Sequence, residues 1–546
     1  MGPSRRVLGC AIAIVMTTAS GWHGPRPAAA QQYEPSLSSV EFLPDPLTRS
    51  PRLVSMGRLT LASDLHNGLN FWDLAGNPLG VAVAESLSSI EFRPVIRTAA
   101  SSHDQATVGS PRERQDLGAR QVQNGLEAWH RTPGGTSYGV IGQFATLKLD
   151  RPSSEFAEAR SEFNVPALAG VVNGPLSWVS GNRLSYAIRL AYTLEVEDRG
   201  YFDFFSIPQG DYIGRRTDEV PAPDTFTPDH NEATTLTGGI GLSYKVTGTI
   251  TAAAMVHHSR SVIKSRNIAL RSESHVNEER PVDLGEFGLH GTLGKHIEWI
   301  ADGQGWSSHS EEFFIWTVSA GATQAPLAGS GKMLDRDAEG TALRTRARWT
   351  SGTLQIDAGF NTSYSRTITT PWYPPAGALL AGFNDFLDQV GFRTNADSLA
   401  LPARIVNGRI EARGYEYSGG FSWRSPWRHA LIGAEFHSRR TRYAQPSYTG
   451  PVPKGWDVRG GAEVRLAPTV LGRLGYVVGY DDADDLSAAN TFLRRTATFG
   501  LGFQPAGSRW SADLGYAFQW VDPDFGDPSR ARGSQQELAL QLRWPF

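Results

Sequence analysis

The sequence contains almost no cysteine: a single residue, Cys10, among 546. Because Cys10 lies so close to the N-terminus, a disulfide framework and a cysteine-ligated zinc site are excluded for the rest of the chain. No run of about 18 apolar residues follows residue 30, so no transmembrane helix is expected there. Lysine and arginine (52 residues) nearly balance aspartate and glutamate (55 residues), so no nucleic-acid partner is expected.

Recognisable catalytic motifs are also missing. The sequence has neither the H-E-x-x-H pattern of zinc proteases nor the G-x-S-x-G pattern of serine hydrolases. Serine, histidine and aspartate are common, but no spacing singles out a catalytic set. We therefore expect no enzymatic activity, no cofactor and no metal site.

The N-terminus has the pattern of a cleavable signal peptide. Arg5 and Arg6 precede an apolar stretch at 7–18, which is too short to span a bilayer, and Ala28–Ala30 offers a cleavage site. We expect residues 1–30 to be removed on export.

The C-terminal residues alternate between apolar and polar with a period of two, which is the pattern of a β-strand. One face carries Leu538, Leu540, Leu542, Trp544 and Phe546. The other face carries Glu537, Gln541 and Arg543. An alternating last strand that ends in Phe resembles the assembly signal of bacterial outer-membrane barrels, which implies the barrel-assembly machinery as a partner.

The same alternation recurs upstream in runs of about 9–12 residues, the length that a tilted strand needs to cross a bilayer. Aromatic residues such as Trp456, Tyr480 and Trp520 stand at the ends of the apolar faces, as an interfacial girdle requires. The sequence therefore predicts an all-β fold, a transmembrane antiparallel β-barrel over residues 86–546. About 18 strands are expected, with 14 or 16 as alternatives. The predicted location is the outer membrane, in contact with its lipid and lipopolysaccharide.

The connections alternate between short and long, as periplasmic turns and external loops do. Short links include 467–470 and 505–508, and long ones include 481–492 and 522–536. The link 296–311 should be short by this rule but reads as long.

Residues 31–85 show little alternation and form a candidate plug. The motifs Ser55–Arg58, Ala62–Asp64 and Asn77–Gly80 resemble the N-terminal hatch of the outer-membrane long-chain fatty-acid transporter family. The resemblance covers about 30 residues, and Leu79 replaces the usual Ala. It implies a monomeric barrel that passes hydrophobic small molecules, with Gly57, Arg58, Asp64, Asn77 and Pro78 as hatch residues. The alternative is a periplasmic extension without a plug function.

Three arginines, Arg344, Arg346 and Arg348, share the polar face of one expected strand. We expect them in the lumen with Asp357, Glu463 and Arg465. Carboxylates opposite the arginines across the lumen would make an ion-paired filling, whereas arginines left open would attract anionic solutes.

Residues 376–392 carry an apolar stripe at helical spacing: Leu379, Leu380, Phe383, Phe386 and Leu387. In an external loop such a helix would capture apolar ligands or rest on the outer leaflet. Alternatively, it packs over the barrel mouth.

These features predict an outer-membrane channel for passive passage of hydrophobic compounds such as long-chain fatty acids. A general or anion-leaning diffusion porin is the first alternative. An outer-membrane barrel enzyme or a structural or adhesion barrel is the second.

Overall fold

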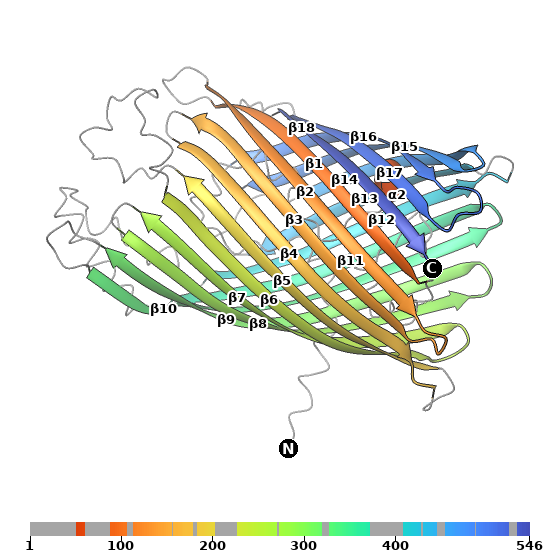
Figure 1. Ribbon diagram of the computed structural model, residues 1–546, viewed down its shortest axis with the longest axis horizontal. Coiled ribbons are helices and arrows are strands. Elements are labelled where there is room, and N and C mark those ends of the chain that lie inside the picture. The colour runs from red at the N-terminus through yellow and green to blue at the C-terminus, as the bar shows by residue number, and fades with distance from the viewer. Residues whose placement is uncertain are drawn as a thin grey trace.

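The computed structural model is a closed barrel of 18 antiparallel strands (Figure 1). Each strand pairs with its neighbours in the sequence, and β1 pairs with β18 to close the ring. The structure describes residues 51–59, 88–105, 113–154, 157–177, 183–201, 227–269, 272–318, 327–371, 408–426, 430–444, 454–485, 488–523 and 532–546. The expected all-β barrel is confirmed, and it has 18 strands rather than 14 or 16.

The described elements are one short helix and the strands of the barrel. They are α2 (Pro51–Ser55), β1 (Ser89–Gln105), β2 (Glu113–Arg131), β3 (Ser137–Ser154), β4 (Ala157–Pro175), β5 (Leu184–Tyr201), β6 (Thr227–Lys245), β7 (Ile250–Ala269), β8 (Ser272–Leu293), β9 (Ile297–Val318), β10 (Leu327–Ser351), β11 (Leu354–Pro371), β12 (Gly408–Arg424), β13 (Ala430–Ala444), β14 (Lys454–Ala467), β15 (Val470–Asp485), β16 (Ala488–Phe503), β17 (Ser511–Pro523) and β18 (Arg532–Pro545). Among the described residues, no helix has the length and apolar character needed to cross a membrane.

The strands are 13 to 25 residues long, longer than the 9–12 residues expected. For example, the segment 481–492 was expected to be a loop, but β15 continues to Asp485 and β16 begins at Ala488. Paired strands satisfy each other's backbone groups, so a ladder can continue beyond the bilayer without an apolar outer face.

One expectation about the connections is wrong. Residues 296–311 do not form a long link; residues 297–311 belong to β9, which follows β8 after a turn at 294–296. Beyond Ala301 the outer face of β9 presents Gly303, Gly305 and Ser307, so the apolar alternation that marks a strand is lost there.

The two ends of the barrel differ. One end, which we call the turn end, carries β1's Ser89 beside Pro545 and the tight connections 246–249, 294–296, 352–353 and 468–469. Gly135, Gly294, Gly352 and Gly507 have positive φ angles in turns at this end, a backbone conformation that glycine adopts without strain. The connections at the opposite end, which we call the loop end, lie outside the described residues.

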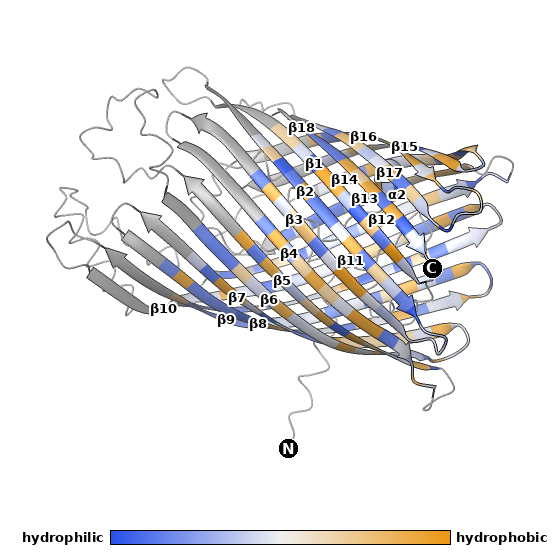
Figure 2. Cartoon of the chain, viewed as in Figure 1, coloured by the Kyte–Doolittle hydropathy of each residue, from blue (hydrophilic) through white to orange (hydrophobic). Residues whose placement is uncertain are grey.

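Large apolar side chains are exposed on the outer face towards the turn end, and hydrophobic and hydrophilic residues alternate along these parts of the strands (Figure 2). Every strand presents at least one exposed large apolar side chain there, for example Leu126 on β2, Leu168 on β4 and Leu474 on β15. Aromatic residues mark both edges of this apolar band. The turn-side edge carries Tyr138, Tyr244, Trp349, Trp423, Phe503 and Trp544, and the loop-side edge carries Tyr192, Tyr417, Trp456 and Trp520.

The height of the band fits a bilayer. Trp510 and Trp520 are ten residues apart on the outer face of β17 and its flank. That spacing corresponds to roughly 33 Å along the strand and to about 24 Å across a membrane for a strand tilted by about 45°. The inner face is the reverse: it buries charged and amide side chains such as Glu127, Gln143, Asp357 and Glu537. The barrel thus has the apolar exterior and polar interior of a transmembrane barrel.

Candidate functional site

Residues 51–59 lie inside the barrel, and we call them the inner segment. Helix α2 and the residues that follow it pack on the lumen side of β14 to β18 (Figure 1). Val54, Met56 and Leu59 are buried, and Met56 and Leu59 pack on Leu431 of β13. The segment is therefore docked on the wall rather than suspended in the lumen.

Glycines of the wall make room for the inner segment. Gly461 and Gly475 face each other in the β14–β15 register, and Gly500 and Gly515 do so in the β16–β17 register. A Cβ atom on Gly475 would collide with the backbone of Met56 and Gly57, and one on Gly515 with the backbone of Pro51. We call these four residues the glycine seat. Only a wall without side chains at these points lets the two backbones approach so closely.

Polar contacts hold the inner segment in register. Arg52 donates two hydrogen bonds to the carboxylate of Glu463, at 2.9 and 3.0 Å. Arg58 forms an ion pair of 3.0 Å with Glu537 on β18. The hydroxyl of Thr498 on β16 accepts a hydrogen bond from the Gly57 amide at 2.9 Å and donates one to the Ser55 carbonyl at 3.0 Å. The wall thus satisfies the backbone groups at the helix end.

Of the five expected hatch residues, the structure describes Gly57 and Arg58. Gly57 has φ +70° and Arg58 has φ +56°, so the chain turns sharply after α2. Asp64, Asn77 and Pro78 lie outside the described residues, as do the expected signal peptide and most of the segment 31–85. Their roles stay predictions.

The three lumen arginines of β10 are each ion-paired. Arg344 Nε lies 3.0 Å from both carboxylate oxygens of Asp302 on β9. Arg346 and Arg348 contact the same oxygen of Asp357, at 3.2 and 2.9 Å. Asp357 is completely buried, so its charge is neutralised by these neighbours rather than by water.

The partners are not where the sequence analysis put them. Asp357 stands on β11, directly beside Arg348 in the register, rather than across the lumen. Glu463 accepts hydrogen bonds from Arg52 of the inner segment and, at 2.7 Å, from Arg473 on β15. Arg465 is exposed at the turn end, and no described carboxylate contacts it. Alternation in sequence identifies the lumen face but not which strand supplies each counter-charge.

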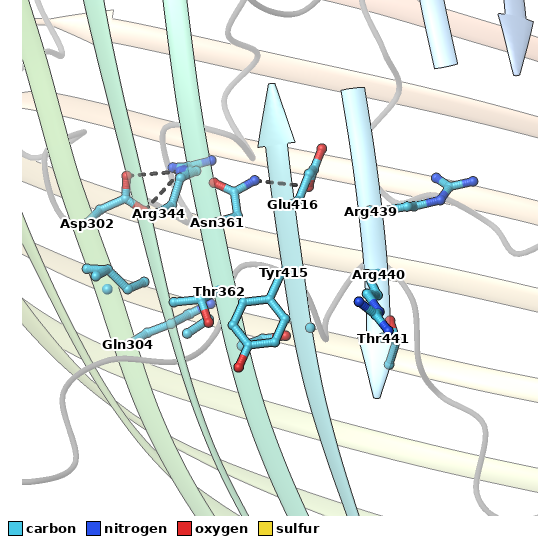
Figure 3. Close-up of a pocket in the computed structure, with 15 residues that line it drawn as sticks. Asp302, Gln304, Arg344, Asn361, Thr362, Tyr415, Glu416, Arg439, Arg440 and Thr441 are labelled. Carbon is cyan, nitrogen blue, oxygen red and sulfur yellow. Dashed lines mark hydrogen bonds and ion pairs between the residues drawn. The ribbon is translucent and has the colours of Figure 1, made fainter. Parts of the chain in front are cut away.

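A groove of about 290 Å³ runs across β9 to β13 (Figure 3). The row between its two walls is Gly303, Leu343, Thr362, Tyr415 and Arg440, which strand alternation places on the outer face. One wall is a row of long polar side chains, one from each strand: Asp302, Arg344, Asn361, Glu416 and Arg439. The other wall is a parallel row of mostly smaller side chains: Gln304, Ala342, Ser363, Gly414 and Thr441. The Asn361 amide donates to Glu416 at 3.0 Å, which fixes the middle of the polar row. The groove can take a small polar group between the rows.

The opposite wall of the lumen is different. Inward-facing positions of β3, β4, β5 and β7 carry buried apolar side chains, which we call the apolar strip. Its members are Ile141, Ala145, Leu147, Ala169, Val171, Ala187, Ala253 and Met255. In a ring of 18 strands, β4 lies nine strands from β13, so the β3 and β4 part of the strip is across the lumen from the groove, whereas its β7 part is two strands from β9. The strip is therefore a set of inward apolar side chains interleaved with polar ones such as Gln143 and His257.

A cluster of three side chains with metal-ligand chemistry stands on the outer face near the loop end. Ligand atoms of His309, Glu311 and Asp335 lie within 4.8 Å of one another. However, Lys332 Nζ lies 2.7 Å from Glu311 and 2.6 Å from Asp335, so an ammonium group already contacts both carboxylates. A metal ion would have to displace Lys332.

The expected assembly residues form the outer face of β18. Leu538, Leu542, Trp544 and Phe546 are exposed, and Leu540 is half-buried on the same face. The apolar loop stripe, Leu379, Leu380, Phe383, Phe386 and Leu387, lies outside the described residues. The sequence analysis missed the groove and the apolar strip. The inward alanines and valines of β3 to β5 do recur at every second position, but that pattern alone does not separate an inner apolar face from an outer one.

Comparisons with known proteins find similarity in structure only. No family model matches the sequence, and no curated protein matches it. Among solved structures, the Pseudomonas putida toluene transporter TodX is 11% identical, with a TM-score of 0.37, covering 91% of this chain and 98% of that one. A Pseudomonas aeruginosa FadL homologue is 12% identical (TM-score 0.35, 91% and 98%). The unliganded ferric citrate transporter FecA is 9% identical (TM-score 0.42, 83% and 78%). At such identities and TM-scores, no property of these proteins is carried over to this chain.

Proposed function

We propose that the protein is an outer-membrane channel for passive passage of hydrophobic small molecules, with long-chain fatty acids as the substrates to test first. The observation that carries this proposal is the apolar strip on the lumen wall. Ile141, Val171 and Met255 are 7% exposed or less, so they would give an acyl chain an apolar surface along the wall once the groups that cover them move aside.

The inner segment supports a gated rather than an open channel. It is seated on one wall by packing, by two ion pairs and by hydrogen bonds to Thr498. We propose that it is the anchored part of a plug formed by residues 31–85, in keeping with the hatch-like motifs of that segment.

The groove favours a second candidate, a diffusion channel with a preference for anions. Arg344 keeps 42% of its side chain exposed beside Asp302, and Arg439 on the same row is also exposed. Cationic groups along the path of a pore attract anionic solutes. The two candidates differ in which wall of the lumen the solute uses.

A pair of measurements separates them. Single-channel conductance of the refolded protein in a planar bilayer is recorded for the full chain and for a deletion of 33–85. Uptake of a fluorescent long-chain fatty acid into vesicles is recorded for the full chain and for Met255→Gln, with Arg439→Gln as the matched variant on the other wall.

A hydrophobic transporter predicts low conductance for the full chain, a large steady pore for the deletion, and slower uptake for Met255→Gln only. A porin predicts free conductance without the deletion, and an ion preference that Arg439→Gln lowers. Equal uptake by Met255→Gln and the unaltered protein would remove the apolar strip as the route.

A further inference from the structure

Three arginines stand together on the outer face of β12 and β13, just beyond the loop-side aromatic edge of the apolar band. We call Arg413, Arg440 and Arg442 the arginine patch; all three are exposed. Strand alternation places Arg413 on the same face as Tyr417 and Phe421, and Arg440 and Arg442 on the same face as Ile432 and Phe436.

The patch concentrates charge of one sign. Arg413 is directly opposite Arg442 in the β12–β13 register, which brings their Cα atoms to about 5 Å. Arg440 is two residues from Arg442 on the same strand, roughly 7 Å away. Like charges placed directly opposite each other destabilise a sheet. A bound anion would relieve this repulsion.

The surrounding chain supplies no such anion among the described residues. The guanidinium of Arg413 lies over the ring of Tyr364, 5.7 Å from its centroid. No described carboxylate contacts Arg413, Arg440 or Arg442. The nearest acidic groups on that face are already engaged: Glu339 binds Arg366 at 2.8 Å, and Glu411 binds Arg409.

Neighbouring strands at the same level show the contrasting arrangement. On β7 and β8, Arg260 binds Glu279 at 2.6 Å and His258 binds Asp283 at 2.8 Å. On β9 and β10, His309 binds Asp337 at 2.7 Å. These outward cations each have a carboxylate on the adjacent strand, whereas no described carboxylate contacts the three arginines of β12 and β13.

We propose that the arginine patch binds the phosphate groups of a phosphorylated lipid in the surrounding leaflet. The patch stands at the aromatic edge of the band, which is the depth of the lipid headgroups. Guanidinium groups bind phosphate oxygens bidentately. The phosphate is taken to come from a lipid because Tyr417 and Phe421 continue the same face as an apolar surface for acyl chains. The proposal rests on the outer-membrane location proposed above.

The test uses the full chain, purified in a non-ionic detergent. Binding of bis-phosphorylated lipid A, of monophosphoryl lipid A and of inorganic phosphate is measured for the unaltered protein and for R413Q/R440Q/R442Q. The matched control is R260Q/E279Q, which removes a paired cation and its carboxylate at the same level. Barrel closure is checked in each variant by heat-modifiable gel migration.

Each arginine near a lipid surface contributes about fivefold to affinity, so the triple variant should bind bis-phosphorylated lipid A about 100-fold more weakly. Monophosphoryl lipid A should bind the unaltered protein less tightly than the bis-phosphorylated form does. The control R260Q/E279Q should bind bis-phosphorylated lipid A as tightly as the unaltered protein does. If the triple variant fails to close, Arg440→Gln alone should still weaken binding about fivefold.

Two results would overturn the proposal: equal lipid affinity in the closed triple variant, or displacement of the lipid by inorganic phosphate at equal concentration. A wrong outer-membrane location would be detected by a separate measurement: the unaltered protein would then not float with lipid vesicles. Fatty-acid uptake should be the same in the triple variant and the unaltered protein, since the patch lies outside the lumen.

Discussion

Arg52 and Glu463 are 411 residues apart in the sequence, yet they are joined by two hydrogen bonds inside the barrel. Glu463 also accepts a hydrogen bond from Arg473, whose other side reaches Asp513 on β17. The inner segment is therefore tied into the ion-pair network of the wall. If the segment were released, Glu463 would lose Arg52 and keep the contact with Arg473.

The first prediction concerns this tie. Glu463→Gln should loosen the inner segment by about 1–3 kcal/mol, because it removes a charge-assisted, half-buried pair. The readout is thiol labelling of Ser55→Cys in vesicles, since Ser55 is buried and Cys10 is the only native cysteine. Labelling should accelerate in Glu463→Gln and not in the control Arg465→Gln. Unchanged labelling in both would mean that packing alone holds the segment.

The second prediction concerns the glycine seat. Gly475→Ala should displace the inner segment, because a Cβ atom there overlaps the backbone of Met56 and Gly57. Gly125→Ala is the control, since its Cβ would meet Arg93 only at an ordinary 3.7 Å. Conductance in a planar bilayer should rise for Gly475→Ala and stay low for Gly125→Ala. A rise in both would argue against a specific seat.

The strands and the two faces of the barrel could be predicted because a bilayer imposes a simple rule. A strand with one face against lipid has an apolar residue at every second position, as from Leu538 to Trp544. The charged residues between these positions must then face inward. The rule fails where the strand leaves the bilayer. Beyond Ala301 the outer face of β9 meets no lipid, so Gly303, Gly305 and Ser307 give no alternation and the strand reads as a loop.

Inside the barrel, sequence spacing reveals orientation but not partners. The arginines of β10 could be assigned to the lumen, but only the register shows that Asp357 is beside Arg348 and that Asp302 binds Arg344. The same holds for Gly461 and Gly475. A glycine can serve a turn, a bulge or a close approach, and only the position of the inner segment decides between them.

The third prediction concerns the buried carboxylate of β11. Asp357→Asn should destabilise the barrel by about 3–5 kcal/mol, because it removes the buried carboxylate that both Arg346 and Arg348 contact. Asp283→Asn, which breaks an exposed pair with His258, should cost less than about 1 kcal/mol. Urea unfolding in vesicles measures both. Similar small losses would mean that water reaches the arginines of β10.

The fourth prediction tests whether the apolar band meets lipid. Leu474 and Leu466 are about equally exposed, at 67% and 65%, but Leu474 lies near the middle of the band and Leu466 at the turn end. In a bilayer, Leu474→Arg should cost about 2–4 kcal/mol and Leu466→Arg about 0–1 kcal/mol, because the penalty for a charge depends on depth. In a water-soluble barrel both leucines would face solvent, and both substitutions would be nearly neutral. Reversible unfolding in vesicles distinguishes the cases: a depth-dependent difference assigns the band to lipid, and two small, equal values would remove the membrane from every proposal made for this chain.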